Sequence, residues 1–247
     1  MHHRMIPRAF FSLVLLGFLG AARFASGQGT QPAANPAVVE VRETLDAARK
    51  EIDAYRAGGG KAAVPDHPAT RWHETLWAYR ERDPGSEAAA LATAEAIQLL
   101  IRAELSDQAH ARVEAVSADD LAWERLAAYL YYEGSARKDF AYAVAKLSEV
   151  AAGSSNAAIK SAALLALGRA QRRQGDNAAA VKSLESARHS APESVSAREA
   201  DGILYEIANL SVGLKAPNFS GKSRAGRAIS LESLRGSVVV MVFWAST

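Results

Sequence analysis

Apolar residues recur at helical spacing from Asn35 to about Leu210, and turn residues interrupt the pattern at short intervals. In the first of these segments the apolar positions alternate spacings of four and three, which places them on one stripe of a helix. They are Val41, Leu45, Ala48, Ile52 and Tyr55. Asn35 is a suitable N-cap, Pro36 favours the first helical position, and a run of glycines from Gly58 follows the stripe. The pattern therefore predicts a helix that begins at Pro36 and ends before Gly58.

Later segments repeat this arrangement of a capping residue followed by an apolar-periodic run. The expected caps are Ser86, then Ser155 or Asn156, then Asp176. Ser117 precedes another run, and Asp120 stands three residues further on, as in a variant of the capping box. Strand signals are scarce before residue 225, so residues 36–212 are predicted to be mainly α.

One stretch, Ser161–Ser194, has the spacing of two helices packed as a hairpin. Small residues stand where the two helices would touch, leucines fill the space between them, and a proline ends the second helix. These residues are Leu164, Leu167, Gly168, Ala180, Leu184, Ala187 and Pro192. Their spacing resembles a tetratricopeptide repeat at nearly every position, although Gln171 replaces the usual aromatic residue.

The repeat is degraded elsewhere, in Trp123–Val150 and more so in Thr70–Glu104. We therefore expect about three helical hairpins, stacked as a short irregular solenoid over residues 36–212. Such a surface suits a protein partner, either a peptide or another domain, and it suits a spacer equally well. The pattern leaves these alternatives and the oligomeric state open.

The helical region shows no pattern typical of a catalytic, cofactor or metal site. His67, His73, His110 and His189 lack the spacing and the acidic neighbours of metal ligands, so packing or surface roles are expected. Asp119 and Asp120 are interpreted as residues of a helix start rather than as a catalytic pair. The 247 residues contain no cysteine, which excludes thiol nucleophiles and zinc–thiolate sites from them.

The N-terminal segment has the three-part pattern of a secretory signal. Arg4 and Arg8 form a basic start, Ala9–Ala22 is apolar, and Ala25-Ser26-Gly27 supplies the small residues of a cleavage site. We expect a signal peptide over 1–27, a flexible leader over 28–35, and a periplasmic or other extracytoplasmic location. The alternative is an uncleaved membrane anchor, but the apolar stretch would rise only about 21 Å as a helix, short of a bilayer core of about 30 Å. The formal charge of +2 gives no electrostatic case for binding nucleic acid.

The pattern changes after residue 212. Pro217 disfavours helix, Ser220–Leu231 alternates around a glycine turn as in a small hairpin, and the next residues form about one helical turn closed by Gly236. Val238–Trp244 is apolar at both odd and even positions, which point to opposite faces of a strand. This predicts a strand covered on both faces in a parallel or mixed sheet.

These parts together resemble the opening of a thioredoxin-like domain of the redoxin, AhpC/TSA and TlpA type, covering residues 213–247. The matching residues are Gly213, Ala216, Pro217, Phe219, Leu231, Leu234, Gly236, Phe243 and Trp244. A signal peptide and a helical region before such a domain are also similar to exported TlpA-like thiol–disulfide oxidoreductases.

The resemblance implies dithiol–disulfide exchange by a C-x-x-C pair at a helix start, where backbone amides stabilise the attacking thiolate. Thr247 takes the position immediately before the first expected cysteine. The sequence is therefore interpreted as a fragment that ends before its redox pair and is inactive by itself, with no cofactor. Two alternatives stay open, namely a fragment of a peroxiredoxin-type peroxidase, and a helical-repeat interaction module whose tail is vestigial.

Overall fold

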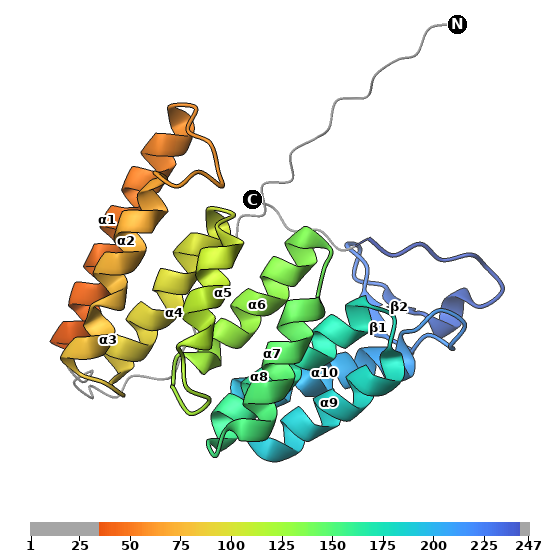
Figure 1. Cartoon of the computed structure of the whole chain (residues 1–247). Coiled ribbons are helices and arrows are strands. Elements are labelled where there is room, and N and C mark those ends of the chain that lie inside the picture. Colours follow the sequence, from red (N-terminus) through yellow and green to blue (C-terminus); the bar gives the residue numbers. More distant parts are fainter. Residues whose placement is uncertain (1–34, 243–247) are drawn as a thin grey trace, which may run out of the picture. The chain divides into compact units, whose positions relative to one another are not determined.

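The computed structural model describes residues 35–242, and this part of the chain is mainly α with one short two-stranded sheet (Figure 1). The helices are α1 (Pro36–Ala57), α2 (Pro68–Trp77), α3 (Tyr79–Arg82), α4 (Glu87–Arg102), α5 (Ser106–Glu114), α6 (Trp123–Arg137), α7 (Ala141–Gly153), α8 (Ala157–Arg173), α9 (Asn177–Ser190) and α10 (Val195–Asn209). Strands β1 (Ser220–Lys222) and β2 (Ala228–Ser230) and the 3-10 helix η1 (Glu232–Leu234) follow. The expected signal peptide and leader, and the motif residues Phe243 and Trp244, lie outside the described residues.

Most of the predicted helix starts are confirmed by side-chain caps. Asn35 accepts a hydrogen bond from the Ala37 amide at 3.0 Å, with Pro36 in the first turn. Three further side chains cap α4, α8 and α9 in the same way, and they belong to Ser86, Asn156 and Asp176. Each cap satisfies one of the amide donors that a helix start leaves without an intrahelical partner.

The predicted capping box at Ser117 is wrong, because α6 begins only at Trp123. The Ser117 carbonyl accepts hydrogen bonds from the Asp120 amide at 3.0 Å and from Trp123 Nε1 at 2.9 Å. Asp120 Oδ1 accepts from the Ala122 amide at 2.9 Å. Residues 117–122 therefore form a turn that the buried indole of Trp123 holds in place, and the helix starts after it.

Most successive helices pack on one another along the chain, and the longer ones form adjacent pairs (Figure 1). Helix α4 contacts α1, α2, α3, α5 and α6, and its residues are buried over most of its length. Its many alanines explain this position, since small side chains let neighbouring helices approach from several sides. No helix in residues 35–242 has the length and apolar character needed to cross a membrane.

The hairpin predicted after residue 219 is confirmed, and the strand predicted after residue 237 is not. β1 and β2 pair antiparallel with Ser220 opposite Ser230, and η1 supplies the expected helical turn. Residues 238–242 are not a strand, and Val238 and Val240 expose 96% and 82% of their surface. A strand needs a neighbour to satisfy its backbone hydrogen bonds, and the described residues offer no such neighbour here.

Candidate functional site: a groove along helix α8

The predicted repeat residues meet at the contact between α8 and α9. A Cβ atom on Gly168 would lie 2.7 Å from Leu184 Cγ and 3.2 Å from the Ala180 carbonyl oxygen, so only glycine fits this approach without a shift. Leu184 and Ala187 are fully buried, and Leu167 is nearly so. The hairpin geometry predicted for this stretch is therefore present.

The remaining positions of the repeat add detail. Leu164 is half-buried and packs against both hydrophobic clusters of the helical region, whereas Pro192 is exposed beyond the end of α9. Gln171 stands where the repeat pattern has an aromatic residue, and its Oε1 accepts a hydrogen bond from Ser183 Oγ at 2.8 Å. A polar contact between α8 and α9 thus replaces aromatic packing at this position.

Most of the described motif residues of the tail gather around one cavity of about 770 Å³, while Phe219 lies 41% exposed outside its lining. The motif residues in the lining are Ala216, Pro217, Leu231 and Leu234, and Tyr205 and Asn209 of α10 complete one side. Gly213 and Gly236 have φ values of +92° and +90°, which other residues rarely adopt. Four of the seven motif residues that the structure describes thus line one cavity.

A groove follows α8 between α6 and α10. Its first part is a cavity of about 660 Å³ whose floor consists of alanines from α6 and α8 together with Leu165. Tyr132 of α6 and Val195 of α10 form apolar edges, with 44% and 63% of their surface exposed. The second part is a cavity of about 510 Å³ towards the C-terminal end of α8, and Arg169 lines both parts.

The second part of the groove is lined by arginines. Arg169, Arg172 and Arg173 line it with Tyr131 of α6 and Ile203 of α10. Two of the guanidinium groups pair with α10, Arg169 with Glu199 at 2.6 Å and Arg172 with Glu206 at 2.9 Å. Arg173 is exposed and forms no ion pair within residues 35–242. The sequence analysis did not single out these arginines, although their spacing along α8 would have placed them on one face.

Three of the four histidines pack inside the helical region, and the fourth lies on the surface. His67 is buried and its Nδ1 accepts the Ala69 amide at 3.0 Å, which caps α2. His73 is buried, and desolvation lowers its pKa. His110 Nε2 lies 2.9 Å from the buried carboxylate of Glu133, and His189 is exposed on α9. Within residues 35–242, no group of three or more potential ligands could hold a metal ion.

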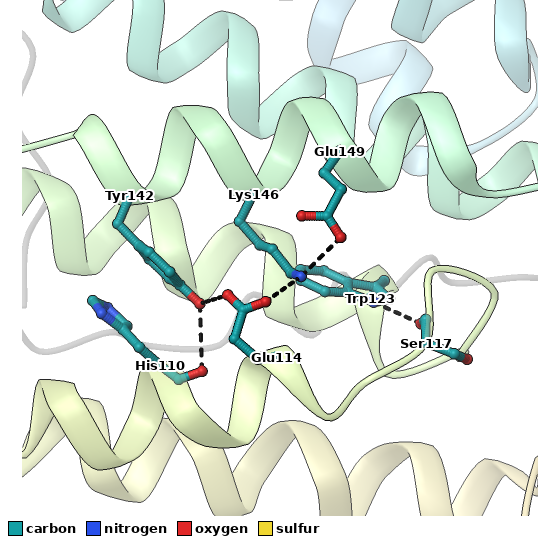
Figure 2. Close-up of polar contacts among 7 residues, drawn as sticks. All are labelled: His110, Glu114, Ser117, Trp123, Tyr142, Lys146 and Glu149. Atoms are coloured by element: carbon teal, nitrogen blue, oxygen red, sulfur yellow. Dashed lines mark hydrogen bonds and ion pairs between the residues drawn. The ribbon is translucent and has the colours of Figure 1, made fainter.

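A polar network joins α5 to α7 (Figure 2). Tyr142 donates a hydrogen bond to Glu114 Oε1 at 2.9 Å, and its ring stacks on His110 at 3.6 Å. Lys146 Nζ donates to Glu114 Oε2 at 2.8 Å and to Glu149 Oε1 at 3.0 Å. The pair Lys146–Glu149 is an i,i+3 contact within α7. The contacts between α5 and α7 are not visible in the sequence, because the two helices belong to different parts of the chain.

The protonation states of this network favour a structural role over acid–base chemistry. Burial disfavours the ammonium of Lys146, but hydrogen bonds to the two glutamates outweigh this effect and raise its pKa. The hydrogen bond from Lys146 lowers the pKa of Glu114. Burial and the bond to Glu114 raise the pKa of Tyr142. Groups shifted further from neutrality are poor proton donors and acceptors in catalysis at neutral pH.

Asp119 and Asp120 act at different helices. Asp120 shapes the turn before α6, whereas Asp119 Oδ1 reaches the start of α8. It accepts hydrogen bonds from Ser154 Oγ at 2.8 Å, the Ser155 amide at 2.7 Å and the Asn156 amide at 3.3 Å. The expectation of helix-start chemistry is thus confirmed for Asp119, but at a helix distant in sequence.

Comparison of the chain with protein-family models, curated proteins and solved structures finds no significant match.

Proposed function

We propose that residues 213–247 are the opening of a thioredoxin-like domain of the TlpA-like or redoxin type, preceded by a tetratricopeptide-like helical region of an exported protein. The supporting observation is that four sequence elements occur in the expected order. These are the Gly213 turn, the β1–β2 hairpin, the helical turn η1 and the apolar segment after Gly236.

The proposed reaction is dithiol–disulfide exchange, which requires a cysteine thiolate as the attacking atom. The 247 residues contain no cysteine, so we expect this chain to have no exchange activity of its own. The strand of such a domain would also supply the missing neighbours of residues 238–242, whose apolar side chains are exposed.

The coding sequence after codon 247 tests this proposal. An in-frame C-x-x-C beginning directly after Thr247 is the expected result. The extended protein should then reduce a disulfide substrate, and a variant with serine in place of the first cysteine should not. A stop codon with no cysteine pair in any nearby frame would contradict the proposal, and a single cysteine deeper in a proline-containing loop would favour the peroxidase alternative.

A second candidate function is that of a protein-interaction module, favoured by the groove along α8. The groove combines an apolar floor with three arginines, of which Arg173 forms no ion pair among residues 35–242, a combination typical of surfaces that hold another polypeptide. This function requires no thiol. It therefore applies to the 247-residue chain as well as to a longer protein.

A pull-down with the 247-residue chain tests the second candidate. We expect a specific protein to be retained equally under reducing and oxidising conditions. Ala128 lines the groove, so the variant Ala128→Phe should fill it and lose the captured protein while the helical circular dichroism is unchanged. If the native chain and the Ala128→Phe variant both retained the captured protein, or if neither did, the result would count against the groove as the binding surface.

A further inference from the structure

The geometry of the groove points to one kind of occupant: an extended segment of a partner protein with small apolar residues followed by acidic residues. This inference rests on the proposed role as an interaction module and names the partner chemistry. The apolar residues would lie over the alanine floor, and the acidic residues would lie at the arginine end of the same groove.

The apolar half of the groove determines the width of the segment. Ala128 of α6 and Ala158 and Ala162 of α8 carry only methyl groups, which leaves a hollow of about 660 Å³ between the three helices. The exposed edges of Tyr132 and Val195 would be covered by a bound chain. A hollow of this volume accepts a few side chains of an extended peptide and is too narrow for a whole domain.

The other half of the groove determines the charge. Arg172 and Arg173 follow each other at the C-terminal end of α8, and Arg169 joins the two halves. Glu206 engages only part of the Arg172 guanidinium, which is 37% exposed, and Arg173 forms no ion pair among residues 35–242. An arginine guanidinium has five N–H donors in a planar fork, so both groups can still bind a carboxylate.

The acidic residues of the groove limit where the partner's negative charge can lie. Glu124, Glu193 and Glu199 line the alanine half together with Arg169 and Arg198, so the charges of this half nearly balance. Arg173, which forms no ion pair among residues 35–242, lies in the other half, so acidic residues of the partner are favoured at that end. This polarity separates a peptide of defined order from a nucleic acid or a membrane surface, which would require cations along the whole face.

Fluorescence anisotropy with defined peptides and the 247-residue chain tests the inference. The probe is a fluorescein-labelled peptide of sequence ALAVEEDE. Two comparison peptides separate the contributions: ALAVKKRK reverses the charge, and SGSGEEDE removes the apolar residues. We expect saturable binding of the first, none of the second, and weaker binding of the third.

Protein variants connect the binding to the groove. Arg173→Gln should weaken binding of ALAVEEDE about tenfold, the effect of one lost charge-assisted hydrogen bond. The matched control is Lys182→Gln, which removes the same charge from an exposed position on α9 outside the groove and should leave binding unchanged. Both substitutions are at exposed positions, so neither is expected to unfold the protein.

Several results would overturn the inference. Equal binding by Arg173→Gln and the native protein would exclude the arginine end. Complete displacement of the peptide by inorganic phosphate, added at a concentration that carries the same total negative charge as the peptide, would indicate a small-anion site. Tighter binding to phosphatidylglycerol vesicles than to the peptide would indicate a membrane surface. Sedimentation showing self-association that Arg173→Gln abolishes would assign the groove to a second copy. None of these measurements involves a thiol, so they are independent of the proposed exchange reaction.

Discussion

Gly168 of α8 and Leu184 of α9 approach so closely that a methyl group on Gly168 would lie 2.7 Å from Leu184 Cγ. This contact sets the distance between the two helices of the hairpin. It also fixes the position of α8, whose side chains line both parts of the groove.

The contact predicts the effect of substitution at Gly168. Gly168→Ala should lower the free energy of unfolding by about 1–2 kcal/mol, because overpacking outweighs the better helix propensity of alanine. The control is Gly202→Ala in α10, where a Cβ atom meets nothing within 4 Å and a gain of about 0.5–1 kcal/mol is expected. Urea denaturation measures both values. A stabilised Gly168→Ala would show that the two helices can separate without cost.

The hydrogen bonds of Asp119 lead us to expect that the protein loses stability in acid. Hydrogen bonds from Ser154 and Ser155 lower its pKa below the ordinary 3.8. A carboxyl with a lowered folded-state pKa stabilises the fold above its unfolded pKa, and this contribution is lost as the pH falls through the folded value. Thermal unfolding of Asp119→Asn between pH 2 and about 5 should show a weaker pH dependence than the native protein. Asp53→Asn, an exposed position on α1, should leave the profile unchanged.

The burial of His67 leads us to expect a second loss of stability, at milder acidity. Burial lowers its pKa below 6.5, and its Nδ1 must be unprotonated to accept the Ala69 amide. Because the unfolded chain binds the proton more readily, stability is complete above pH 6.5 and decreases as the pH falls below it. His67→Asn keeps a side-chain acceptor without this titration, so its melting temperature should decrease less across this range than that of the native protein, in which both His67 and His73 have lowered pKa values. An unchanged decrease in that variant would assign the effect to another group.

The hydrogen bond from Lys146 to Glu114 should couple α5 and α7 energetically. Its side chain is only 6% exposed, whereas Glu114 is 54% exposed. Lys146→Met should cost only about 1–2 kcal/mol although two charged hydrogen bonds are lost, since water can partly solvate the exposed carboxylates that remain. A double-mutant cycle with Glu114→Gln measures the pair, and equilibrium denaturation of the four proteins gives the coupling free energy. Additive effects would show that the two side chains do not stabilise each other.

The helices could be predicted largely from local patterns. Asn35, Ser86 and Asp176 cap as expected because a cap depends on a side chain and an amide two or three residues away. The α8–α9 hairpin could be predicted as well, since glycine at position 168 and alanine at 180 are required wherever two helices pack closely. The turn before α6 could not, because the buried indole of Trp123 and the Ser117 carbonyl decide where that helix begins.

The candidate site depended on tertiary structure to a greater extent. Local sequence determined the helical class, the caps, the β1–β2 hairpin and the residues of the α8–α9 contact, all of which involve groups near each other along the chain. Only the folded structure brought Arg173 of α8 beside Tyr131 of α6 and linked Asp119 to the start of α8. Such contacts join residues far apart in sequence, and their geometry follows from how the helices pack rather than from any local spacing.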